Sequence, residues 1–167
     1  MDILNKVANS GLVTLDLEEL YDNSPKILFD IKPLLFKELI LKEKDFREFI
    51  TVHNWKSYQD ACVGITCTVD AIVPNWAYML IAANLQPYAK KIVFGNLDEL
   101  EKELFSEAIK KMNPQDYQDC RLVIKGCSKI NVPVSAYVEV TAHFKPYVKS
   151  IMYGEPCSTV PVYKKAK

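Results

Sequence analysis

The sequence lacks several features that mark common functional classes. Only five glycines occur among 167 residues, and neither the GxGxxG nor the GxxxxGK[ST] pattern of phosphate-binding loops is present. No GxSxG motif supports a serine nucleophile, and no two cysteines form the CxxC pair of local zinc or ferredoxin sites. These absences disfavour nucleotide binding by a glycine-rich loop, serine hydrolase chemistry and a local metal knuckle.

Charge of one sign and long apolar runs are also missing. The chain has 21 basic and 21 acidic residues, and it has no basic stripe of the kind that binds a phosphate backbone. The first residues show no apolar signal region, and the longest strongly apolar run, 76–83, is far too short to span a membrane. We expect a cytoplasmic protein with no nucleic-acid or membrane partner.

An internal repeat is the most informative feature that is present. Aligning the chain with itself at an offset of 59 pairs residues 46–95 with residues 105–154, and eighteen of the fifty positions are identical. Unrelated sequences of ordinary composition would share about 3. Recurring residues include Tyr58, Pro74 and Tyr78, which return as Tyr117, Pro133 and Tyr137. The repeat predicts an internal duplication.

The apolar pattern predicts the same elements in each copy: helix, short strand, turn, helix and strand. Helices are expected at 42–53 and 97–112, and strands at 26–31, 62–67, 91–94, 121–127 and 150–153. This alternation is typical of one α/β domain with a mainly parallel sheet of about five strands and crossover helices. We expect residues 1–25 to form an N-terminal arm, with 12–17 an edge strand or part of the arm, 26–154 the duplicated core, and 155–167 a cysteine-containing C-terminal segment.

Three of the five cysteines fall where an open parallel sheet binds ligands, in loops that follow the carboxyl ends of strands. Cys67 and Cys127 end predicted strands, and Cys157 follows the last strand by four residues. Each cysteine precedes a hydroxyl residue and, a little later, a Val-Pro pair. Thiolates are the ligands of zinc and of iron–sulfur clusters. The pattern favours a metal or cluster site formed by these three residues.

Other assignments remain open at this stage. Asp70 and Glu155 are candidate additional ligands or general acids, or else solvated loop carboxylates. Free cysteine is often a small buried side chain, so all three loop thiols could instead be packed. Cys62 and Cys120 fall at strand starts and are expected to be structural, and an odd number of cysteines argues against a fully paired disulfide framework.

Several stretches resemble one family, an uncharacterised bacterial family known as domain of unknown function 2480. The resemblance covers nearly the whole chain and is carried by ANSGLVTLDL at 8–17, EKDFREF at 43–49, 71–74 with 76–80, IKGCS at 124–128, and SIMYGEPCSTVP at 150–161. It brings no established activity, but it implies an association with iron–sulfur assembly components. The resemblance therefore favours the thiolate hypothesis.

Three functional hypotheses follow. The first is a zinc or iron–sulfur site at Cys67, Cys127 and Cys157 in a protein accessory to iron–sulfur cluster assembly. The second is a non-catalytic protein-interaction or scaffold module with structural cysteines, in which residues 1–25 could form a homodimer face. The third is a small-molecule enzyme that uses Asp70 or Glu155 beside a reactive cysteine.

Overall fold

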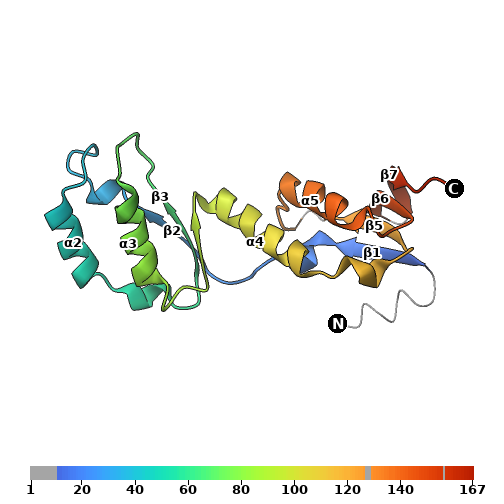
Figure 1. Cartoon of the computed structure of the whole chain (residues 1–167), viewed down its shortest axis with the longest axis horizontal. Helices are drawn as coiled ribbons and strands as arrows, with labels where there is room; N and C mark the ends of the chain where they lie inside the picture. Colours follow the sequence, from blue (N-terminus) through green and yellow to red (C-terminus); the bar gives the residue numbers. More distant parts are fainter. Residues whose placement is uncertain (1–10, 127–128, 156) are drawn as a thin grey trace. The chain divides into compact units, whose positions relative to one another are not determined.

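The computed structural model describes residues 11–126, 129–155 and 157–167 (Figure 1). The contacts between residues divide the chain into two compact units. Unit 1 comprises Met1–Asp22 and Leu104–Lys167, and unit 2 comprises Asn23–Glu103. Unit 2 is therefore inserted into the sequence of unit 1. Each unit has its own hydrophobic core and its own sheet.

Unit 2 contains a three-stranded parallel sheet in the order β2-β3-β4. Its elements are β2 (Lys26–Asp30), the 3-10 helix η2 (Lys32–Leu34), α2 (Glu43–Val52), the 3-10 helix η3 (Trp55–Tyr58), β3 (Cys62–Thr66), α3 (Asn75–Leu85) and β4 (Lys91–Phe94). Helices α2 and α3 lie side by side (Figure 1). The register places Lys26, Cys62 and Lys91 in one row across the sheet.

The core of unit 2 follows from the alternation of side chains along its strands. Phe29, Val63 and Ile65 are buried and share one face of the sheet, because side chains of a strand alternate between faces. Phe29 stacks on Trp55 with ring centroids 5.8 Å apart. On the opposite face, Lys26 and Lys91 form ion pairs with the first turns of α4 (Leu97–Lys111). The middle strand β3 is thus covered on both faces.

Unit 1 contains a four-stranded sheet in the order β1-β5-β6-β7. Its elements are β1 (Leu12–Asp16), the 3-10 helix η1 (Leu17–Leu20), the C-terminal part of α4, the 3-10 helix η4 (Pro114–Tyr117), β5 (Arg121–Lys125), α5 (Val134–Phe144), β6 (Ser150–Glu155) and β7 (Ser158–Lys164). The first three strands are parallel, and β7 runs antiparallel to β6 with a bulge between Ile151 and Met152.

The structure confirms the α/β class and the crossover helices, but it corrects the number of sheets. The expected single sheet of about five strands is two mostly parallel sheets of three and four strands. Residues 12–16 form an edge strand, which is one of the two alternatives predicted for 12–17. Strand β7 was not expected at all. The order of elements along a chain does not say which strands pair, and the insertion of unit 2 separates β1 from its partner β5.

None of the helices in the described part of the chain combines the length and apolar character needed to cross a membrane.

Candidate functional site

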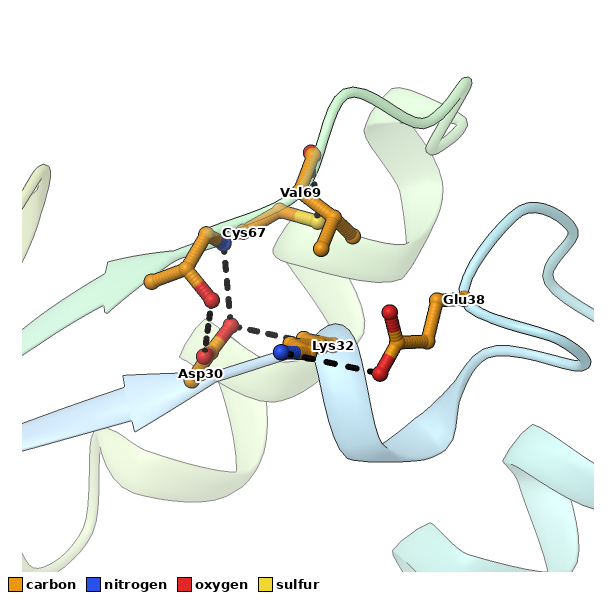
Figure 2. Close-up of polar contacts among 6 residues, drawn as sticks. Asp30, Lys32, Glu38, Cys67 and Val69 are labelled. Carbon is orange, nitrogen blue, oxygen red and sulfur yellow. Dashed lines mark hydrogen bonds and ion pairs between the residues drawn. The ribbon is translucent and has the colours of Figure 1, made fainter.

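Cys67 lies just beyond the carboxyl end of β3 and is half-buried. Its thiol donates a hydrogen bond to the backbone carbonyl oxygen of Val69, with the sulfur 3.4 Å from that oxygen (Figure 2). This hydrogen bond links the Cys67 side chain to the backbone two residues further along the same loop.

The other two predicted ligands belong to unit 1. Cys157 is exposed in the turn between β6 and β7, and Cys127 lies outside the described residues. Cys67 follows a strand of the unit 2 sheet and Cys157 a strand of the unit 1 sheet, so the two do not share the single sheet edge that the sequence led us to expect. Within 11–126, 129–155 and 157–167, no group of three or more His, Cys, Asp or Glu residues is arranged to hold a metal ion. The three-cysteine site stays a prediction.

The two candidate carboxylates have different surroundings. Asp70 is exposed in the loop after β3. Glu155 is also exposed, and its carboxylate forms an ion pair with Lys125, with 3.6 Å between the charged atoms. Ion pairs between exposed groups contribute little to stability. In this structure the Glu155 carboxylate is therefore a surface partner of the Lys125 ammonium group.

The two cysteines expected to be structural are deeply buried. Cys62 and Cys120 are 0% and 2% exposed, and burial raises the pKa of the Cys120 thiol. A raised pKa leaves less thiolate at neutral pH, and the thiolate is the reactive form. Their surroundings are those of packing residues.

A carboxylate organises the carboxyl end of the unit 2 sheet. Asp30, the last residue of β2, accepts hydrogen bonds from the Thr68 hydroxyl at 2.5 Å, from the Thr68 N–H at 3.1 Å and from the Lys32 N–H at 3.0 Å (Figure 2). Partial burial acts to raise the pKa of Asp30, but these hydrogen bonds outweigh it and the pKa lies below its usual value. The ends of β2 and β3 are thereby tied together.

Unit 1 has a related arrangement at the ends of β1 and β5. Asp16, the last residue of β1, accepts the N–H of Glu18 and forms an ion pair with Lys125 at 3.6 Å. The Glu18 carboxylate accepts the N–H groups of Lys129 and Ile130 in the loop after β5, at 3.2 and 3.1 Å. In both units, a carboxylate near the end of the first strand holds the loop that follows the second strand.

An aromatic pair lies near this end of each sheet. Tyr78 of α3 meets Phe94 of β4 edge to face, with ring centroids 5.4 Å apart. Tyr137 of α5 meets Tyr153 of β6 in the same manner at 5.7 Å. Burial raises the pKa of both Tyr78 and Tyr137. The phenol oxygen of Tyr137 also packs directly over Gly126, where a side chain would collide with it.

Unit 1 contains an apolar pocket between α5, β6 and β7. Its volume is about 410 Å³. Residues of all three elements and of β5 line it, namely Ile124, Val134, Tyr137, Thr141, Ile151, Met152, Tyr153 and Val162. The sequence pattern does not predict the pocket, because Val162 in one wall belongs to β7, a strand that the pattern does not indicate.

Comparison with known proteins identifies the family and nothing beyond it. The family described as "Protein of unknown function (DUF2480)" matches residues 1–165. No curated protein matches the chain, and no solved structure does. Because the match extends over almost the entire sequence and agrees with the resemblance found in its motifs, the chain belongs to the DUF2480 family.

Proposed function

We propose that this protein is a binding module and that the pocket of unit 1 takes a small, uncharged, mainly apolar ligand. The observation that carries this proposal is the pocket itself, whose volume of about 410 Å³ is within the range of ligand sites, roughly 300–1,000 Å³. Its walls are aliphatic and aromatic, and an apolar ligand would gain free energy by leaving water.

Three of the lining residues, Tyr137, Thr141 and Tyr153, carry hydroxyl groups that give the pocket some polarity. Thr141 donates its hydroxyl hydrogen to the backbone carbonyl of Tyr137 at 2.7 Å, so the oxygen can still accept a hydrogen bond. At the offset of 59, Thr141 and Tyr153 replace Ala82 and Phe94 of unit 2. Both changes add a hydroxyl. They favour a ligand with an apolar body and one hydrogen-bond donor.

A neutral bicyclic phenol tests this proposal. We expect 1-naphthol to bind saturably in isothermal titration calorimetry. Val162→Trp should weaken binding about tenfold or more, because the new ring would fill the pocket from β7. The matched control is Val160→Trp, on the same strand but not among the lining residues, with 60% exposure against 54% for Val162. No saturable binding, or equal losses in the two variants, would contradict the proposal.

We also infer that the two units are copies of one ancestral unit. The registers support this inference. One row across the unit 2 sheet contains Lys26, Cys62 and Lys91, and the matching row of unit 1 contains Leu12, Arg121 and Ser150. Arg121 lies 59 positions after Cys62, and Ser150 lies 59 positions after Lys91, which is the offset of the sequence repeat. On this inference, the two sheets and their helices can be compared position by position.

A thiolate metal centre is the second candidate function. One observation favours it: β5 and β6 are neighbouring parallel strands, and Cys127 and Cys157 each follow their strand by two residues. Cysteine thiolates are the ligands of zinc and of iron–sulfur clusters, and such a site would suit a protein accessory to cluster assembly. Cys67 belongs to the other sheet, so we place it outside this reduced ligand set.

Anaerobic purification with metal analysis and an absorption spectrum tests the second candidate. Bound zinc or iron should be lost in Cys127→Ser and Cys157→Ser and kept in Cys67→Ser. Metal retained in all three variants, or none in the anaerobically purified protein, would argue against it.

A further inference from the structure

Strand β4 forms an open edge of the unit 2 sheet. The strand order is β2-β3-β4, and no strand among the described residues pairs with β4 on the side away from β3. Another extended chain can pair with the backbone of an edge strand, and proteins often guard such edges with proline or with charged side chains. The sequence of β4, KIVF, contains no proline. Its one charged residue, Lys91, is engaged by Glu103 at 3.8 Å.

The equivalent strand of unit 1 shows what such an edge can bind. On the inferred correspondence of the two units, β4 matches β6, because Ile92 and Phe94 lie 59 positions before Ile151 and Tyr153. Strand β6 is not an edge strand, since β7 pairs with it in the antiparallel direction and places Val160 opposite Tyr153. Unit 1 therefore has a fourth strand at the position where the described part of unit 2 has none.

The side chains of β4 are more exposed than their counterparts in β6. Phe94 is 72% exposed, whereas Tyr153 is 45% exposed. Ile92 is half-buried, whereas Ile151 is completely buried. Both aromatic rings have the same support from their own unit, because each meets a tyrosine of the preceding helix edge to face. We attribute the larger exposure of β4 to the lack of a fourth strand.

The two strands also differ in length, and strand pairing explains the difference. Strand β4 ends at Phe94, whereas β6 continues through Gly154 and Glu155. These two residues pair with Thr159 and Ser158 of β7. The additional length of β6 is therefore the part that its neighbour β7 holds in an extended conformation.

Apolar side chains of α3 lie beside the open edge. In unit 1, Tyr137 and Thr141 of α5 line the pocket together with Val162 of β7. Their counterparts on α3 are Tyr78 and Ala82, which are half-buried. A strand paired with β4 would place every second side chain on the α3 side of the sheet. An aliphatic side chain there would cover Tyr78 and Ala82, in the place that Val162 has in unit 1.

We propose that the open edge of β4 binds an extended segment of a partner protein, which pairs antiparallel to β4 as β7 pairs with β6. The segment has aliphatic residues at alternate positions, because one side of it lies against α3. The precedent in unit 1 is a single strand with no helix of its own, whereas the β4 strand of a second copy would bring its own α3 to the same side. The proposal rests on the inferred correspondence of the two units and does not require a ligand in the pocket of unit 1.

A peptide with the sequence of β7, STVPVYKK (158–165), tests the proposal. The fluorescein-labelled peptide should bind the full chain saturably in fluorescence anisotropy, over about 1 to 500 μM protein. Phe94→Lys should weaken binding about tenfold or more, because the change removes an apolar contact and places a charge at the edge. The matched control is Val52→Lys in α2, where the side chain is 81% exposed, and this variant should bind like the wild type.

Modified peptides test the backbone pairing separately from apolar contact. Lys165 donates its N–H to the carbonyl oxygen of Lys149, and such bonds recur at every second residue of an antiparallel ladder. The N–H of Tyr163 therefore points to the neighbouring strand, and that of Val162 points away. N-methylation of the peptide at Tyr163 should weaken binding about tenfold, and N-methylation at Val162 should leave it unchanged.

Thermal unfolding of each protein variant reports its fold. The proposal would be overturned by a peptide that does not bind saturably, or by equal losses with the two methylated peptides. Binding that folded Phe94→Lys protein retains in full would overturn it too, because the peptide would then replace β7 in unit 1. Self-association of the wild-type chain that Phe94→Lys abolishes would assign the edge to a second copy instead. The 1-naphthol titration depends on unit 1 alone, so either proposal can fail without the other.

Discussion

The carboxylate of Asp30 and the hydroxyl of Thr68 are 2.5 Å apart, and this hydrogen bond joins the last residue of β2 to the loop after β3. The two residues are 38 positions apart in the sequence. A contact of this kind fixes the edge of the sheet where Cys67 lies. It also makes the stability of unit 2 depend on the ionisation of one carboxyl group.

Replacing Thr68 by valine should lower the free energy of unfolding by about 1 kcal/mol at neutral pH, because the variant keeps the shape of threonine but loses the donor. The pKa of Asp30 is lowered in the folded state. Its contribution is therefore complete above the unfolded pKa, about 3.9, and is lost as the pH falls through the folded value.

Urea unfolding of the wild type and Thr68→Val between pH 7 and pH 3 measures this effect. The difference between the two proteins should be constant above about pH 5 and should shrink below about pH 4. Thr14→Val, at an exposed position of β1, is the control. A difference that is the same at pH 3 and pH 7 would show that Asp30 is not responsible.

Replacing Glu18 by alanine should release the loop after β5. The Glu18 carboxylate accepts the N–H groups of Lys129 and Ile130, and without it these groups lose their acceptor. Trypsin should then cut after Lys129 faster than in the wild type, because proteolysis follows local opening. Glu18→Gln keeps one acceptor oxygen and should be intermediate, and Glu19→Ala should cleave like the wild type. Equal rates in all four proteins would rule out this role for Glu18.

The cysteines that the structure describes should differ in how fast they react with a disulfide-exchange reagent. Cys157 is exposed and should react in the native protein, whereas Cys62 and Cys120 are buried and should react only after unfolding. The measurement is the number of thiols that react rapidly in the folded protein. This number should be lower by one in Cys157→Ser than in the wild type. Fast reaction of Cys62 or Cys120 in folded protein would contradict their assignment as packing residues.

Alanine at Gly126 should destabilise unit 1 by up to about 1 kcal/mol, because the phenol end of the Tyr137 side chain must shift to make room. An added Cβ would collide with the phenol oxygen of Tyr137. Combining Gly126→Ala with Tyr137→Leu should recover part of the loss, since the shorter side chain vacates that space. Chemical denaturation of the two single variants and the double variant gives the coupling energy. Strictly additive effects would mean that the tyrosine is not the obstacle.

Local patterns in the sequence predict the helices and most of the strands of this protein. The expected helices at 42–53 and 97–112 correspond to α2 (Glu43–Val52) and α4 (Leu97–Lys111). These elements are predictable because burial of one side leaves a periodic apolar pattern. The partners of the strands leave no such pattern. Nothing near β1 indicates that it pairs with β5, more than a hundred positions away.

The site was predictable only in part, for the same reason. Cys67 and Cys157 do follow strands, but the strands belong to different sheets. The pocket depends on β7, whose sequence STVPVYK contains a proline and weak alternation. Proline is tolerated in edge strands and at bulges, and β7 has both properties. The apolar run 76–83 was recognised, but only the structure shows that one side of it faces solvent.

The insertion of unit 2 has a consequence for the order in which the chain folds. Unit 2 is continuous in sequence, from Asn23 to Glu103, whereas the hydrogen bond between Glu18 and Lys129 spans 111 positions. Contacts that close long loops form slowly. During synthesis, unit 2 is complete while β1 still awaits β5. Until residues 121–125 have been made, β1 has no partner strand, and an unpaired strand edge is prone to aggregation.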